Sequence, residues 1–383
     1  MAACTGLIVA NIYYIQPLIV LVAKEFNIPE NIAGSTAYLT QAGYAVGLLL
    51  LVPLGDMMEK RKQILLVTSL AVLSLIGVAV APAFWIMQLA CFLLGLSSIV
   101  PQLILPLAAN LADAAQRGKV IGTIMSGLLI GILLSRTLSG AVGHWLGWRS
   151  MFWIAAAICI AIIAVIYKRF PKNHSSFSGH YGILMRSLLT LVKTQPLLRE
   201  ATAISMCSFA VFGSFWTTMV LLFSNDPYHF TSDQVGLFGL AGAAGAFAAP
   251  LVGGMGDKGN LRRTIGVSLG ILVFSLSLLY FSAYFIPGFI IGIILLDIGL
   301  QGIHISNQTR VYALIPEARN RLNTVYMSCS FAGTATGSAI GLNLWKHFNW
   351  GGVIAGNIIL SVLGILILVF SAKRAGKRKI ITA

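Results

Sequence analysis

Charged side chains are scarce in this chain. Only 10% of its 383 residues are charged, 57% are hydrophobic, and the mean hydropathy is +0.88. A soluble domain has about 25% charged and about 45–50% apolar residues. The composition excludes a water-soluble enzyme, a nucleic-acid-binding protein and a disordered chain. Apolar runs that recur along the whole length indicate a protein with many membrane spans.

Motifs for catalysis, nucleotide binding and metal binding are also missing. The five cysteines lie in apolar stretches without CxxC or Cys/His spacing, which argues against a disulfide framework and a zinc site. The sequence has no GxxxxGK[ST] loop, no HExxH and no GxSxG with catalytic partners. We therefore expect no enzyme, no metal and no cofactor. The segment 1–9 has no basic residue and begins the first span rather than a signal peptide.

Hydrophobic segments long enough to cross about 30 Å of hydrocarbon recur twelve times. The predicted spans are 4–26, 33–57, 63–81, 84–112, 120–143, 149–168, 200–223, 233–256, 263–285, 287–313, 322–345 and 351–372.

The basic residues predict the orientation of these spans. Of the 26 lysines and arginines, all but Lys24, Arg136, Arg149 and Lys346 lie in or beside connections after even-numbered spans or in the C-terminal tail. The positive-inside rule then places both termini in the cytoplasm. The net charge of +15 thus orients the chain and indicates no nucleic-acid partner.

The chain repeats itself at about 200 residues. The segment Arg117…Met125-Ser126…Gly131…Trp148 recurs as Arg319…Met327-Ser328…Gly333…Trp350, each member offset by 202. Such a repeat predicts two parallel six-helix halves. We expect an N-terminal half at 1–170, a cytoplasmic linker at 171–199 and a C-terminal half with a basic tail at 200–383. Within the linker, 184–192 has the pattern of an amphipathic helix.

Several longer stretches resemble one family of membrane proteins. They are the turn Pro53–Lys62, its second copy Gly253–Lys258, and the segments Tyr13–Leu18, Leu296–Gln301, Ile305–Gln308 and Pro316–Met327. On these residues the chain resembles the major facilitator superfamily, and within it the bacterial twelve-span drug/metabolite:proton antiporters. The nearest group is similar to efflux permeases for purine ribonucleosides and sugars. The resemblance implies an all-α fold of twelve transmembrane helices in the bacterial inner membrane, and we expect a monomer in the lipid bilayer.

Two helices depart from the pattern of that family. Its arginine in the fourth helix falls at Cys91. Its fifth-helix signature has Gly-Pro and Gly-Gly where this chain has Ser135-Arg136 and Ser139-Gly140.

Among the eleven acidic residues, only Asp297 lies in the middle of a span, about 15 Å deep at 1.5 Å per residue. A charge there costs about 2.5–3.5 kcal/mol, so such residues usually face a cavity. A carboxyl group in that place can bind and release a proton. Asp297, Gln301, His304 and Gln308 share one helix face. One interpretation is that this face lines a polar pathway, with Asp297 and His304 as candidates for proton coupling. The alternative is that these residues only form hydrogen bonds between the helix and its neighbours.

Arg136 is the basic residue deep inside the fifth span. A buried arginine requires a carboxylate, an anionic ligand or several carbonyl groups. One hypothesis is an Arg136–Asp297 pair that breaks when Asp297 is protonated or substrate enters. The alternative is a static arginine that fills the place of the missing proline.

Amides, hydroxyls and aromatic rings at mid-depth are candidates for substrate binding. Such groups suit a neutral or amphipathic ligand, although each alone is more often a contact between helices. The candidates are Asn11, Tyr14, Gln16, Gln41, Gln102, Phe215, Trp216, Gln301 and Gln308.

Charges at the predicted cytoplasmic helix ends indicate a conformational latch. Its members are Asp56, Lys60, Arg61, Asp257, Lys258 and Arg262. The resemblance implies that this network holds the outward-facing state. A separate small-residue stripe, Gly127 and Gly131 with Gly333, Gly337 and Gly341, predicts close backbone packing where the halves meet.

The sequence therefore predicts a secondary transporter that exports a small organic molecule in exchange for protons by alternating access. Two alternatives stay open. One is proton-coupled uptake or facilitated transport of a nutrient such as a sugar or nucleoside. The other is a transporter-like sensor or partner subunit.

Overall fold

The computed structural model describes residues 1–113, 116–171, 180–256 and 260–381. Every regular element in these ranges is helical, as expected for an all-α fold. The α-helices are α1 (Ala2–Val9), α2 (Ile19–Phe26), α3 (Glu30–Ala33), α4 (Ser35–Leu50), α5 (Lys60–Val80), α6 (Phe84–Ser97), α7 (Val100–Leu111), α8 (Arg117–Leu146), α9 (Trp148–Arg169), α10 (Tyr181–Thr194), α11 (Pro196–Ser224), α12 (Ser232–Gly256), α13 (Leu261–Phe281), α14 (Ile286–Tyr312) and α15 (Arg319–Ile381).

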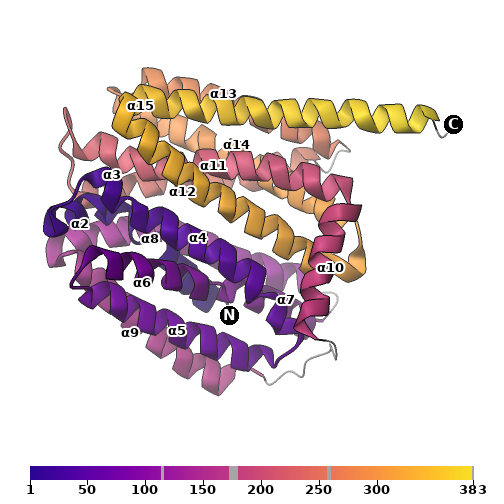
Figure 1. Cartoon of the computed structure of the whole chain (residues 1–383), viewed down its shortest axis with the longest axis horizontal. Helices are drawn as coiled ribbons and strands as arrows, with labels where there is room; N and C mark the ends of the chain where they lie inside the picture. Colours follow the sequence, from indigo (N-terminus) through magenta and orange to yellow (C-terminus); the bar gives the residue numbers. More distant parts are fainter. Residues whose placement is uncertain (114–115, 172–179, 257–259, 382–383) are drawn as a thin grey trace. The chain divides into compact units, whose positions relative to one another are not determined.

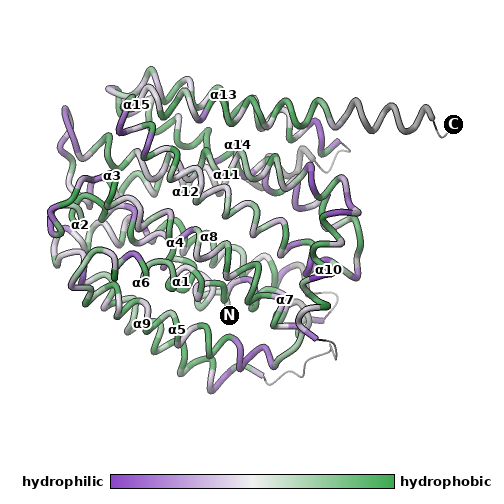
Figure 2. Tube along the Cα trace, viewed as in Figure 1, coloured by the Kyte–Doolittle hydropathy of each residue, from purple (hydrophilic) through white to green (hydrophobic). Residues whose placement is uncertain are grey.

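Within the described part of the chain, ten segments are long and apolar enough to cross a membrane. Nine match the predicted spans one to seven, nine and ten, and the tenth, Arg319–Ser371, contains the last two predicted spans. The predicted eighth span corresponds to α12. Hydrophobic residues make up most of α5, α9 and α13 (Figure 2). The protein is therefore a multi-pass membrane protein.

The first and fourth spans are broken in the middle. Between α1 and α2 the chain forms two short 3₁₀ turns, Ala10–Ile12 and Gln16–Leu18. Between α6 and α7 the break falls at Ser98 and Ile99. Each break lies beside a proline, Pro17 or Pro101, which has no N–H to donate to a helix. Broken spans leave backbone carbonyl groups for other partners within the membrane.

A different break divides α15. Asn349 has φ 51° and ψ −154°, which is not helical, and the helix continues on both sides of it. The expected connection of five residues between the last two spans, 346–350, is thus reduced to this single residue.

Two compact units are defined by the contacts within the chain. Unit 1 contains Met1–Arg186 and Trp216–Ala243, and unit 2 contains Ser187–Phe215 and Ala244–Ala383. In unit 1, α5 lies beside α9, and in unit 2, α13 lies beside α14 (Figure 1). The predicted linker contains α10, which includes the 184–192 segment expected to be helical. The halves at 1–170 and 200–383 stay a prediction.

The glycine stripes allow helix backbones to touch, but not where the sequence predicted. A Cβ added at Gly131 would lie 2.1 Å from the carbonyl oxygen of Gly6 in α1. One added at Gly337 would lie 2.0 Å from the carbonyl oxygen of Ala210 in α11. Each contact joins two helices of the same predicted half. The expectation that these glycines pack one half on the other was wrong, because the close approaches serve packing inside each half.

Candidate functional site

The side chain of Arg136 contacts the faces of two aromatic rings in unit 1. Its guanidinium carbon is 4.7 Å from the ring centroid of Tyr13 and 4.2 Å from that of Trp216. Nε donates a hydrogen bond of 2.8 Å to Oε1 of Gln16. Only 3% of Arg136 is exposed. Cation–π contacts of a desolvated guanidinium are worth about 2 kcal/mol, so the two rings help to hold this charge away from water.

The break in the first span positions this cluster. Tyr13 precedes the second 3₁₀ turn, and Gln16 begins it. Ser139, one turn after Arg136 on α8, donates its hydroxyl proton to the carbonyl oxygen of Tyr14. A broken helix leaves carbonyl groups without their usual N–H partners. The hydrogen bond from Ser139 satisfies one of these groups and joins α8 to the broken segment of the first span. Ser139 and Arg136 stand at positions where the chain departs from the family signature, and both contact the broken part of the first span.

The other polar candidates of unit 1 have contacts of their own. Asn11 places Nδ2 at 3.7 Å from Sγ of Cys159. Gln102 on α7 forms a hydrogen bond with Tyr44 of α4. Gln41 is fully buried on α4, and the ring of Tyr14 is buried as well. Gln16 and Trp216 are substrate-binding candidates that contact Arg136 directly.

Phe215, although adjacent to Trp216, packs elsewhere. Its ring lies 6.1 Å from Phe289, nearly parallel to it, and 6.1 Å from Trp350. These contacts belong to the apolar interior of unit 2, where Phe215 is fully buried. The two neighbouring aromatic residues thus belong to different units and have different surroundings.

Asp297 is buried in α14, with 5% of the residue exposed. It lies where α12 comes close: a Cβ added at Gly245 would lie 2.7 Å from Cβ of Asp297 and 2.7 Å from the carbonyl oxygen of Ile294. The position predicted to lie deep in the tenth span is therefore buried against a neighbouring helix. The proposed pair with Arg136 joins residues of different units and stays a prediction.

The rest of the predicted face of α14 is half-buried. Gln301, His304 and Gln308 all keep partial exposure. His304 Nδ1 lies 3.1 Å from the hydroxyl oxygen of Tyr326 on α15. Gln308 donates to Oδ1 of Asn323 and to the hydroxyl of Tyr312, both at 3.2 Å. The face thus combines one buried acid with three half-buried polar residues.

The predicted latch residues of unit 1 make contacts at the start of α5. Arg61 Nη2 donates to the carbonyl oxygen of Tyr167, and its guanidinium carbon lies 5.2 Å from the centroid of the Tyr167 ring. Asp56 and Lys60 attract each other electrostatically. These contacts join α5 to the end of α9. The latch role of these residues stays a prediction.

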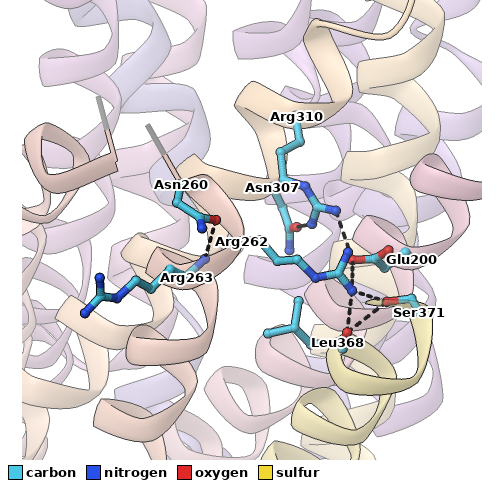
Figure 3. A network of polar contacts seen from close by, with 8 residues as sticks. All are labelled: Glu200, Asn260, Arg262, Arg263, Asn307, Arg310, Leu368 and Ser371. Atoms are coloured by element: carbon cyan, nitrogen blue, oxygen red, sulfur yellow. Dashed lines mark hydrogen bonds and ion pairs between the residues drawn. The ribbon is translucent and has the colours of Figure 1, made fainter. Parts of the chain in front are cut away.

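In unit 2 the corresponding end is joined by a larger network (Figure 3). Arg262 donates to the carbonyl oxygen of Leu368 and, at 2.6 Å, to Oγ of Ser371. Oε1 of Glu200 lies 3.5 Å from Nη2 of Arg262 and 2.9 Å from Nη2 of Arg310. The network therefore connects α11, α13, α14 and α15. The predicted latch members Asp257 and Lys258 lie outside the described residues.

Sequence reasoning missed Tyr13, Glu200, Arg310 and Tyr326. Tyr13 had a signal, since it precedes Gln16 by three residues, or about one helical turn. Glu200 and Arg310 are 110 positions apart, and no spacing rule relates them. Tyr326 is separated from His304 by the turn between α14 and α15.

Comparison with known proteins agrees with this architecture. The family model of the Major Facilitator Superfamily matches residues 1–284 and 201–382. The chain belongs to the major facilitator superfamily of membrane transporters.

Several relatives cover nearly the whole chain. The "Uncharacterized transporter YgaY" of Escherichia coli O157:H7 is 40% identical over 96% of this chain and 93% of its own length. A "Probable sugar efflux transporter" of Pasteurella multocida is 25% identical over 91% of this chain and 85% of its own. The crystal structure of the human organic anion transporter MFSD10 shares the fold, with a TM-score of 0.70 at 15% identity, covering 96% of this chain and 98% of that one.

Proposed function

We propose that this transporter exports a small organic molecule in exchange for protons. The observation that carries the proposal is Asp297, a carboxyl group buried in a helix that is otherwise long and apolar. Acidic residues within transmembrane segments commonly serve proton movement, because a carboxyl group can change its charge state there. The relatives named as sugar efflux transporters support the outward direction.

The Arg136 cluster supports a substrate with both apolar and hydrogen-bonding parts. The rings of Tyr13 and Trp216 supply apolar surface beside Arg136, and Nε2 of Gln16 is a buried donor without a hydrogen-bond partner among the described residues. We propose that the protein is a monomer in the bacterial inner membrane. Both termini would lie in the cytoplasm, because the basic residues follow the even-numbered spans. The proton gradient supplies the energy.

Everted membrane vesicles test the proposal. Respiration acidifies their interior, and a pH-sensitive dye reports the gradient. Addition of a transported glycoside or nucleoside should dissipate part of the gradient in vesicles that contain the protein, and not in vesicles without it. Accumulation of the compound by intact cells would instead support uptake, and vesicles that respond to no compound would support a sensor.

A further inference from the structure

His304 is held by a chain of hydroxyl groups within unit 2. Its Nδ1 lies 3.1 Å from the hydroxyl oxygen of Tyr326, which is also 3.1 Å from the carbonyl oxygen of His304. Oγ of Ser205 on α11 lies 3.1 Å from the same hydroxyl and 2.7 Å from Oγ of Ser330. Tyr326, Ser205 and Ser330 are fully buried. The ring of Phe209 meets the imidazole edge-on at 5.3 Å and restricts its rotation.

The hydrogen bond from Tyr326 to the carbonyl oxygen of His304 favours one tautomer of His304. A carbonyl oxygen only accepts, so this bond uses the single hydroxyl proton of Tyr326. The hydroxyl oxygen of Tyr326 then accepts from Nδ1 of His304. In this arrangement the proton of the neutral imidazole is on Nδ1, and Nε2 carries the lone pair.

That lone pair is open to a ligand. Among the described residues Nε2 has no protein partner, and it is not among the polar atoms sealed off from solvent. Two charged residues on the same pair of helices, Glu200 near the start of α11 and Arg310 near the end of α14, form an ion pair with each other at 2.9 Å.

Gln308 repeats the pattern one turn further along α14. Both of its amide protons are used, one by Oδ1 of Asn323 and one by the hydroxyl of Tyr312. Its Oε1 therefore remains as an acceptor without a protein partner among the described residues. Four residues of helix separate the two acceptors by about 6 Å along the axis.

We infer that Nε2 of His304 and Oε1 of Gln308 form an acceptor pair that binds hydroxyl groups of the transported molecule, with Tyr326 and Ser205 as positioning residues. The inference rests on the proposed function, since it names the substrate class, a molecule that carries several hydroxyl groups. A ligand without hydrogen-bond donors would leave both acceptors unpaired. It should bind much more weakly, because an unpaired polar group in a desolvated site costs free energy.

The tautomer can be tested without any ligand. We expect ¹⁵N spectra of histidine-labelled protein in mildly alkaline buffer to show an unprotonated Nε2 for one residue, identified by its loss in His304→Gln. Tyr326→Phe or Ser205→Ala should convert this signal to a mixture of tautomers, whereas Tyr280→Phe, a control at a half-exposed tyrosine of α13, should not. A protonated Nε2 in the unmodified protein overturns the inference, whatever the transport measurements show.

The substrate class is tested by thermal stabilisation of the purified protein. The probes are matched pairs: methyl glucoside and adenosine, each against its fully O-methylated counterpart. At least one hydroxylated member should bind and its O-methylated partner at least about tenfold more weakly, a difference of about 1.4 kcal/mol. His304→Phe should reduce that preference, and His304→Gln, which keeps an acceptor, should retain most of it. Equal binding within each pair, or binding by no hydroxylated member, contradicts the inference. Binding without proton exchange in vesicles contradicts only the proposed function.

Discussion

Arg61 and Arg262 make the same contact 201 residues apart: each donates from Nη2 to a backbone carbonyl oxygen, of Tyr167 in α9 and of Leu368 in α15, which are themselves 201 residues apart. The internal repeat therefore extends from the sequence to single hydrogen bonds. The two arginines differ in one respect. Arg262 also contacts Glu200 and Ser371, whereas Arg61 adds only the face of the Tyr167 ring.

This difference predicts unequal effects of the same substitution. Arg262→Lys should lower the free energy of unfolding by about 1–2 kcal/mol, because lysine cannot satisfy a carboxylate, a hydroxyl and a carbonyl from one planar group. Arg61→Lys, at an exposed site, serves as the matched control and should have a smaller effect. Thermal unfolding in detergent measures both. Equal shifts in the two variants would mean that Glu200 and Ser371 add nothing.

The packing of α11 against α15 predicts a strong effect at Gly337. A methyl group there would lie 2.0 Å from the carbonyl oxygen of Ala210, so the helix backbones would have to separate. Gly337→Ala should destabilise the protein by about 1–3 kcal/mol. Gly270→Ala on α13 is the control, because a Cβ there meets nothing within 4 Å, and it should be neutral or slightly stabilising. Unfolding of the two purified variants under the same conditions makes the comparison.

Substitution of Asp297 should separate proton coupling from substrate movement. Asp297→Asn keeps the size of the side chain but removes its charge, so substrate should no longer dissipate a pH gradient in everted vesicles. Exchange of labelled for unlabelled substrate, which moves no net protons, should continue. Asp226→Asn, at a side chain that is 93% exposed, is the control and should behave like the unmodified protein. Gradient dissipation that persists in Asp297→Asn would exclude this carboxyl group as the coupling site.

Arg136 should affect transport through both its charge and its planar shape. Arg136→Ala should reduce transport at least about tenfold and alter its pH dependence, because it removes the cation that contacts the rings of Tyr13 and Trp216. Arg136→Lys keeps the charge, loses the stacked plane and should retain an intermediate rate. Arg169→Ala, at an exposed arginine of α9, is the control. Unchanged transport and pH dependence in Arg136→Ala would contradict the proposed pair with Asp297 and favour a static arginine.

Hydropathy and residue spacing predicted the helical class, most of the spans and the burial of Asp297, because each depends on a local run of residues. The surroundings of Arg136 could not be predicted in the same way. Two 3₁₀ turns rotate the first span between residues 10 and 18, so that the ring of Tyr13 covers the guanidinium group while Tyr14 offers its carbonyl oxygen to Ser139. A regular helix drawn from the sequence does not contain that rotation.

The sequence also could not predict which helices pack against the glycine stripes or which residues contact His304. Small residues at four-residue spacing indicate that some helix comes close, but they do not say which one. The tautomer of His304 depends on Ser205 and Tyr326, which lie on two other helices. Long-range packing decides such contacts, and the sequence alone contains no spacing rule for them.

The single non-helical residue Asn349 couples the last two spans mechanically. Consecutive Cα atoms are 3.8 Å apart, so Phe348 and Trp350 have almost no slack between them. Trp350 in turn donates its indole N–H to the carbonyl oxygen of Leu279 in α13, at 3.3 Å. The end of the eleventh span and the start of the twelfth therefore stay adjacent, and the Trp350 hydrogen bond holds this junction beside α13.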